Sequence, residues 1–153
     1  MYPEILAALE ASWLGNAARH SPWLFTGANL LHVLGSALLV GAIAVFDLRV
    51  LAGRGAWETG RTAIPLAAAG LALQIPTGLV LLAVEARALG QNPAFLAKAG
   101  LVALGVANVA LFHARFGGPR RGLPLPGAAR LQAGVSLGAW VLALLAGRLI
   151  AYL

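Results

Sequence analysis

Residues 28–50 read ANLLHVLGSALLVGAIAVFDLRV, and this stretch decides the fold class. It belongs to a run over residues 21–46 that contains no Asp, Glu, Lys or Arg. Such a run is long enough to cross the hydrocarbon core of a bilayer as one helix. The stretch nevertheless carries His32 part-way along and ends on Asp47 and Arg49. Because ionisable side chains inside a membrane are costly, they need a functional or structural explanation.

The composition of the whole chain agrees with a membrane location. Of its 153 residues, 60% are hydrophobic and only 10% are charged, and its mean hydropathy is +0.84. A soluble domain has about 25% charged residues, so we predict an integral membrane protein with one domain, residues 1–153. The absence of cysteine excludes disulfides, thiolate metal sites and iron–sulfur clusters. The net charge of +6 lies in loops between apolar spans, and we expect no nucleic-acid partner.

Four stretches are long and apolar enough to span the membrane. We place them at about residues 23–46, 62–84, 95–114 and 131–152. Before them, residues 2–18 carry apolar side chains at helical spacing and predict an amphipathic helix lying in the interface. Met1 is followed by Tyr-Pro-Glu, so we expect no cleavable signal peptide. The predicted fold is therefore all-α: a four-helix transmembrane bundle with an N-terminal interfacial helix, in contact with the lipid bilayer.

The basic residues predict the orientation of this bundle. Seven of the eleven lie in the two loops at one end, and the positive-inside rule places those loops in the cytoplasm and both termini outside. These seven residues are Arg49, Arg54, Arg61, Arg115, Arg120, Arg121 and Arg130.

Small residues at four-residue spacing predict where helices touch, because helices in lipid associate through close backbone contact. The pairs are Ala37 and Gly41 in the first span and Gly134 and Gly138 in the fourth. We expect a tight bundle. Gly134 and Gly138 can serve either that bundle or contact with a second copy or another membrane protein.

A polar stripe follows the first span. At 100° per residue, Asn29, His32, Ser36 and Asp47 lie near one face of the helix, and polar groups in membranes usually face the interior. His32 is the central candidate: it can bind haem iron or a metal, relay protons, or simply hold helices together through a hydrogen bond.

Other polar residues mark further candidate positions. His113, near the end of the third span, is a candidate ligand, and Asp47 can pair with it or with Arg49. Asp47 and Arg49 can equally form an interfacial charge pair. Gln74 precedes Pro76 at the middle of the second span, where proline frees a backbone carbonyl and Thr77 can bond to the backbone.

The third and fourth spans add three polar or basic residues. Asn108 predicts an interhelical hydrogen bond, whereas Lys98 and Arg148 are placed to extend their side chains toward the headgroups. The chain has no phosphate-binding glycine loop, nucleophile elbow or HExxH motif, so it offers no residues for hydrolysis or phosphoryl transfer.

The sequence resembles a group of small four-helix bacterial inner-membrane proteins of uncharacterised function. The resemblance covers about residues 20–115 and rests on HVLGSALLVGAIAVFDLRVL (32–51) and NPAFLAKAGLVALGVANVALFH (92–113). More distantly, the pattern is similar to copper-resistance D-type membrane domains and to four-helix b-type cytochromes. The resemblance implies a bacterial inner membrane, and it implies His32 and His113 as ligands of haem b or a copper ion.

Helix geometry opposes one haem shared by these two histidines. With the spans placed as above, His32 and His113 differ in depth by about 18 Å. Three arrangements stay open: one haem held by a single histidine, His20 as a second ligand folding inward, or His32 paired with its copy in an oligomer.

Three functions follow from these residues. The first is haem- or metal-dependent electron transfer, with Asn29, Ser36 and Gln74 around His32. The second is a small transport or copper-handling protein, in which the polar stripe lines a path. The third is a non-catalytic membrane subunit that packs in a larger complex through its glycine faces.

Overall fold

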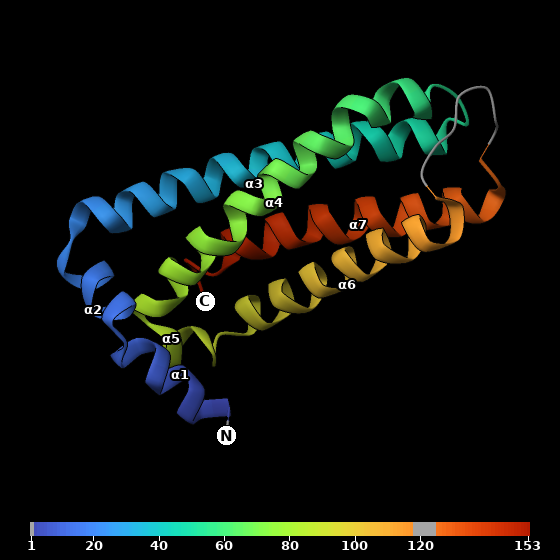
Figure 1. The fold of residues 1–153 in the computed structure, drawn as a ribbon. Helices are drawn as coiled ribbons and strands as arrows, with labels where there is room; N and C mark the ends of the chain where they lie inside the picture. Colours follow the sequence, from blue (N-terminus) through green and yellow to red (C-terminus); the bar gives the residue numbers. More distant parts are fainter. Residues whose placement is uncertain (1, 118–124) are drawn as a thin grey trace.

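The computed structural model describes residues 2–117 and 125–153, and all regular structure in these two ranges is helical. Arg120 and Arg121, two of the loop arginines, lie outside the described residues. The described residues form four long and three short helices, and Figure 1 shows the short ones at the end of the bundle that holds both chain termini. The helices are α1 (Tyr2–Ala11), α2 (Trp13–His20), α3 (Pro22–Leu51), α4 (Ala56–Val84), α5 (Ala86–Leu89), α6 (Pro93–Phe116) and α7 (Gly127–Leu149).

The four long helices α3, α4, α6 and α7 confirm the four predicted spans, because each has the length and hydropathy needed to cross a membrane. α3 and α6 extend beyond the predicted limits at both ends, and α4 extends at its start. α7 begins and ends earlier than predicted.

The starts of two of these helices follow from local hydrogen bonding. The Ser21 side chain accepts a hydrogen bond from the Leu24 amide at the start of α3, and Asn92 caps α6 in the same way. In both helices a proline stands at the first position, where its missing N–H costs little.

The N-terminal region contains two helices where the sequence predicts one. Ser12 interrupts the predicted helix and begins α2, because its side chain accepts a hydrogen bond from the Gly15 amide. A periodic apolar pattern continues through such a break, so the pattern alone does not reveal it. Gly15 also explains why α2 lies close to the bundle: an added Cβ would lie 2.7 Å from the Ala83 carbonyl oxygen at the end of α4.

This N-terminal region is held against the end of α4 by polar contacts as well. Arg19 donates to the carbonyl oxygens of Ala83 and Val84, which the end of α4 leaves without helical partners. Glu10 forms an ion pair with Arg87 at 2.9 Å, and hydrogen bonding from Arg87 lowers the pKa of the Glu10 carboxyl. The predicted interfacial segment is therefore also docked on the bundle.

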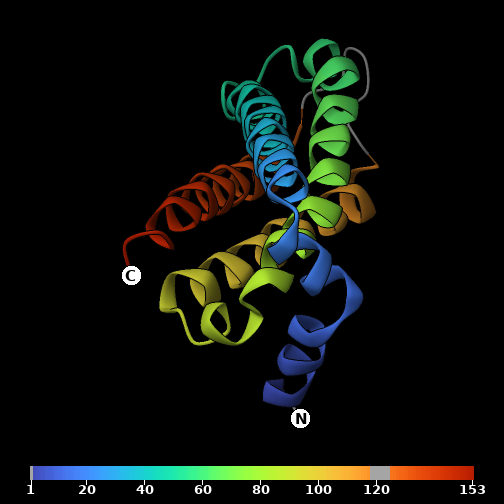
Figure 2. The same ribbon diagram turned by 90° about the vertical axis from the view of Figure 1, so that its left-hand side faces the viewer.

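The four long helices form the predicted four-helix bundle, but one pair of them is not packed along its length. α3 packs along α4 and along α7, and α6 packs along α7. α4 and α6 do not pack along one another, and Figure 2 shows α3 between α4 and α7. One side of the bundle is consequently open between α4 and α6.

Glycine allows the closest helix contact, between α3 and α4. A Cβ added to Gly70 would lie 2.5 Å from the Leu39 amide nitrogen and 2.8 Å from the Gly35 carbonyl oxygen. In contrast, a Cβ added at Gly41, Gly134 or Gly138 would meet nothing within 4 Å. These glycines therefore do not serve the contacts within one chain, and contact with a second chain through Gly134 and Gly138 stays a prediction.

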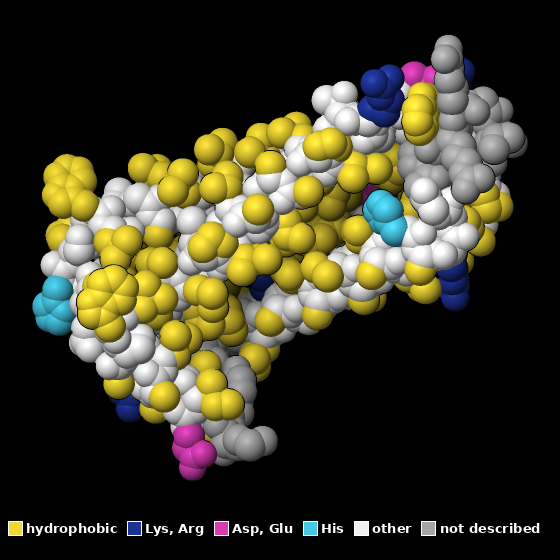
Figure 3. Space-filling model, viewed as in Figure 1, with side chains coloured by type: hydrophobic (Ala, Val, Ile, Leu, Met, Phe, Trp, Pro, Cys, Tyr) yellow, Lys and Arg dark blue, Asp and Glu magenta, His cyan; other side chains and the backbone are white. Residues whose placement is uncertain are grey.

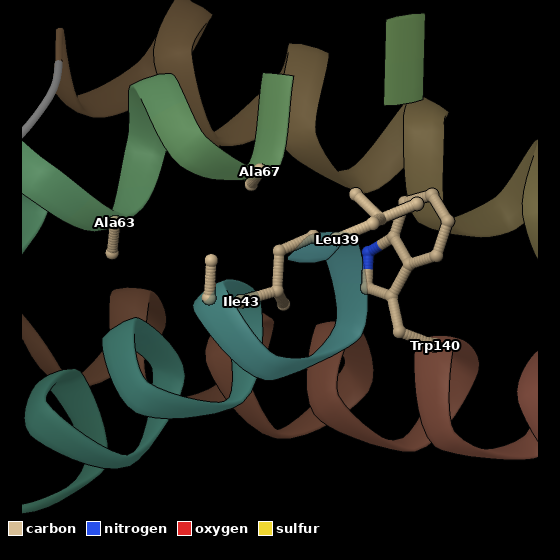
Figure 4. Close-up of a cluster of buried hydrophobic side chains, with 6 residues drawn as sticks. Leu39, Ile43, Ala63, Ala67 and Trp140 are labelled. Carbon is tan, nitrogen blue, oxygen red and sulfur yellow. The ribbon is translucent and has the colours of Figure 1, made fainter. Parts of the chain in front are cut away.

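The buried core lies midway along the long helices and continues toward the end of the bundle where α3 ends and α7 begins. One cluster contains side chains from three helices, and in it the Trp140 indole ring lies beside Leu39 (Figure 4). Its members include Leu39 and Ile43 of α3, Ala63 and Ala67 of α4, and Trp140 of α7.

The two ends of the bundle differ in charge. We call the end that holds both chain termini the termini end. We call the other the arginine end, because five exposed arginines lie in or near the last turns of α3 and α6, the first turns of α4 and α7, or the loop between α3 and α4: Arg49, Arg54, Arg61, Arg115 and Arg130. The orientation of these ends in the membrane stays a prediction.

Candidate functional site

His32 lies in the half of the bundle nearer the termini end, between α3, α4 and α6. Its ring is half-buried, and both ring nitrogens have polar neighbours. Nδ1 lies 2.9 Å from Thr77 Oγ1 on α4, and Nε2 lies 3.4 Å from Lys98 Nζ on α6. His32 therefore connects three helices, including the two that are not packed along one another.

The hydrogen bonds of Thr77 determine which His32 nitrogen carries the proton. The Thr77 hydroxyl donates its only hydrogen to the Leu73 carbonyl oxygen at 2.6 Å, so toward His32 it can only accept. His32 Nδ1 must then be the donor, which leaves Nε2 as the acceptor in the neutral ring. The Nε2 lone pair faces the Lys98 amine, and a protonated lysine donates to it.

The backbone of His32 is tied to α4 by two further side chains. Gln74 Nε2 donates to the His32 carbonyl oxygen at 2.8 Å and also to Ser36 Oγ. Ser36 in turn donates to the same carbonyl oxygen at 2.9 Å. His32, Ser36 and Gln74, three of the predicted site residues, are thus brought together with Thr77 and Lys98. We call these five residues the histidine–lysine cluster.

Two glycines make room for this cluster. A Cβ at Gly78 would lie 3.2 Å from His32 Cε1, and one at Gly147 would lie 3.1 Å from Lys98 Nζ. Larger residues at either position would push the imidazole or the ammonium group away. The side-chain contact between His32 and Lys98 therefore depends on small residues from α4 and α7.

The other predicted site residues lie elsewhere. Asn29 is exposed, so the prediction that it shares the interior face with His32 is wrong: burial depends on which helices pack at that level and not only on the angle. Asp47 is buried in the other half of the bundle. Arg49 is exposed, and His113 is exposed with Nδ1 2.9 Å from the Val109 carbonyl oxygen. No ion pair joins Asp47 to His113 or Arg49 in the described residues.

Asn108 makes the interhelical hydrogen bond that the sequence predicts. Its side-chain amide donates to the Gln132 carbonyl oxygen on α7 at 3.0 Å, in a buried position.

Sequence reasoning did not find Lys98 as a site residue. Its place near the end of a span is compatible with a side chain that reaches the headgroups, yet the ammonium group turns inward to His32. Thr77 was expected only to bond to its own helix, which it does, but it also accepts from His32. Lys98 is the only Asp, Glu, Lys or Arg in the predicted span 95–114, and this isolation could have indicated that it belongs to a site.

Binding of haem iron or copper at His32 stays a prediction. Nε2, the nitrogen whose lone pair could bind a metal, faces the Lys98 amine, so Lys98 would have to move to open that position. The described residues contain no group of three or more His, Cys, Asp or Glu side chains placed to hold a metal. His113 is also distant: the axial rise from Lys98 to His113 along α6 is about 22 Å.

We compared the chain with protein-family models, with curated proteins and with solved structures, and none of these comparisons found a match.

Proposed function

We propose that this integral membrane protein is a small transport protein that carries protons, and that His32 and Lys98 are its proton-exchanging pair. The observation that carries the proposal is the 3.4 Å contact between Lys98 Nζ and His32 Nε2 inside the span region. Two basic nitrogens at this distance compete for protons. If both side chains were charged, they would repel each other by about 5 kcal/mol at an effective dielectric constant of about 20.

The pair therefore favours one positive charge over two, and that charge can move between the two nitrogens along the line that joins them. A purely structural link between α3 and α4 needs no ionisable side chain, because Gln74 already joins these helices by donating to the His32 carbonyl oxygen and to Ser36 Oγ. Ionisable residues retained inside a membrane commonly mark ion and proton pathways. The retention of His32 and Lys98 in the spans therefore favours proton transfer over a structural role.

The proposed path continues from the pair toward Asp47, the other buried ionisable side chain in the described spans. Between them lies the apolar layer of Leu39 and Trp140. A proton crosses this layer only when water or another hydroxyl-bearing molecule bridges it. The positive-inside rule predicts that the pair exchanges protons with the outer side of the membrane.

The test is a proton-flux assay in liposomes that contain a pH-sensitive dye, with a potassium diffusion potential as the driving force. We expect wild-type protein to increase proton flux above that of empty liposomes, and Lys98→Met and His32→Gln to remove most of the increase. Lys98→Arg is the sharpest variant, because arginine keeps the positive charge but does not release its proton. It should retain the fold and lose the flux.

Arg148→Met is the matched control, since Arg148 is an exposed basic residue at the same end of the bundle and contacts Tyr152, away from His32. Circular dichroism and gel filtration verify that each variant is folded. Wild-type flux equal to that of empty liposomes, or equal flux in wild type and Lys98→Arg, overturns the proposal.

A further inference from the structure

A cavity of about 180 Å³ lies in the half of the bundle nearer the arginine end, among α3, α4, α6 and α7. Most of its lining is apolar and includes Phe46 of α3, Ala67 of α4, and Val109 and Phe112 of α6. Because α4 and α6 do not pack along one another, the cavity is partly open between them. Figure 3 shows this side of the molecule, where hydrophobic side chains line a hollow between the two helices.

Three side chains bring to this cavity polar atoms that have no hydrogen-bond partner among the described residues. The atoms are Asp47 Oδ2, Gln132 Nε2 and Oε1, and Trp140 Nε1. The three residues are only 4%, 8% and 3% exposed, and all three line the cavity. Unpaired polar groups cost several kcal/mol each in the apolar interior of a membrane. A bound molecule that pairs with them removes this cost.

The spacing of these groups describes the molecule that would fit. Gln132, Ser136 and Trp140 recur every four residues on one face of α7, so they extend over about 12 Å. The Ser136 hydroxyl lies beside the Asp47 carboxyl, near the middle of this row. Figure 4 shows the Trp140 indole nitrogen directed toward the side of the cluster that holds Ile43. The cavity thus offers N–H donors at both ends and carboxyl and amide oxygen acceptors.

A lipid acyl chain fits the apolar lining but leaves these polar atoms unpaired. Water pairs with them but gains nothing from the apolar walls. An apolar cavity of about 150 Å³ takes benzene, so a cavity of this volume accommodates one substituted ring. A ring with a hydroxyl group can donate to an acceptor such as Asp47 and accept from Gln132 or Trp140.

We propose that this cavity, bounded by Asp47, Gln132 and Trp140, is a binding site for a lipid-soluble phenol that enters from the bilayer between α4 and α6. The occupant is a single aromatic ring with a hydroxyl group, and any alkyl substituent extends into the lipid through the opening. This inference rests on the proposed function, because the site lies on the path of the proposed proton transfer. The bound phenol would be the hydroxyl-bearing molecule that bridges the apolar layer. Binding itself requires no proton gradient, so each proposal can fail alone.

The test uses Trp140 as the reporter in protein reconstituted in phospholipid nanodiscs. Trp13, Trp23 and Trp57 lie outside the cavity and are replaced by phenylalanine, which leaves Trp140 as the only tryptophan of the original four. The probes are 4-bromophenol and 4-bromotoluene, which quench tryptophan fluorescence and differ by a hydroxyl in place of a methyl group. Both are titrated at equal measured concentrations in the membrane.

We expect saturable quenching, with 4-bromophenol binding at least about tenfold more tightly than 4-bromotoluene, a difference of about 1.4 kcal/mol. Gln132→Met retains the approximate side-chain volume and should reduce that preference severalfold. Gln91→Met, at an exposed position outside the cavity, should keep it.

Equal affinity for the two probes would show an apolar site for acyl chains, and it would overturn the proposal. So would the absence of saturable quenching by either probe, which indicates a cavity filled by water. The comparison of probes needs no cavity variant, so misfolding of Gln132→Met does not prevent the test.

Discussion

Gly70→Ala tests the closest helix contact in the protein. The added Cβ would lie 2.5 Å from the Leu39 amide nitrogen and 2.8 Å from the Gly35 carbonyl oxygen. Both atoms belong to the backbone of α3, so no side-chain rotation can relieve the overlap. The two helices must separate by several tenths of an ångström or more. We expect looser contact along α3 and α4, including the bond from Gln74 to the His32 carbonyl oxygen.

The magnitude follows from two opposing effects. Alanine is favoured over glycine inside a helix by about 0.5–1 kcal/mol, whereas overpacking costs about 1–3 kcal/mol. Gly100→Ala isolates the first effect, because a Cβ at Gly100 in α6 meets nothing within 4 Å. The difference in unfolding free energy between the two variants therefore measures the packing cost, and we expect about 1–3 kcal/mol.

The assay is SDS-induced unfolding in mixed micelles, followed by circular dichroism and tryptophan fluorescence. Wild type, Gly70→Ala and Gly100→Ala are measured in the same micelles, and gel filtration verifies that their oligomeric state is unchanged. If Gly70→Ala is as stable as Gly100→Ala to within about 0.5 kcal/mol, α3 and α4 are not packed as described, and the reasoning is refuted.

Two further predictions concern polar contacts. Asn108→Ala removes the buried bond from α6 to the Gln132 carbonyl oxygen and should lower the unfolding free energy by about 0.6–1.7 kcal/mol; the exposed Asn29→Ala serves as control, and an equal loss in both contradicts the assignment. The Glu10–Arg87 pair lowers the Glu10 pKa from its ordinary 4.5, so its stabilisation is full above that value and is lost as pH falls through the lowered pKa. The protection factors of the amides of residues 2–20, which correct for the intrinsic pH dependence of exchange, should fall at low pH in wild type, whereas Glu10→Gln should show low protection at both pH values; protection in Glu10→Gln equal to that of wild type at neutral pH would contradict this.

The four spans were predictable because the number of consecutive apolar residues determines whether a helix can cross the bilayer. The break at Ser12 was not, since the apolar period continues through it. Ser12, a residue type favoured at helix N-caps, could have indicated the second start. The open side of the bundle was also not predictable, because small residues show which faces can touch but not which faces do.

The site was partly predictable for a related reason. His32, Ser36 and Gln74 were found because polar groups are rare in apolar spans and therefore conspicuous. The inward direction of Lys98 depends on the rotation of α6 and on the space at Gly147, neither of which sequence spacing defines. The row of Gln132, Ser136 and Trp140 has a regular four-residue spacing, and the same helical reasoning that gave the stripe on α3 could have revealed it.

Because the cavity opens between α4 and α6, its occupancy depends on the concentration of ligand in the membrane and not on the concentration in water. Phe46 and Phe112, with ring centroids 6.0 Å apart, link α3 to α6 toward the arginine end, and the His32–Lys98 contact links the same helices toward the termini end. Between these two contacts, the opening between α4 and α6 faces the acyl chains of the lipid. A ligand entering there equilibrates first with the membrane, so its apparent affinity measured against water is the intrinsic affinity multiplied by its partition coefficient. Lipophilicity thus acts as a first stage of selection, before Asp47, Gln132 or Trp140 is reached.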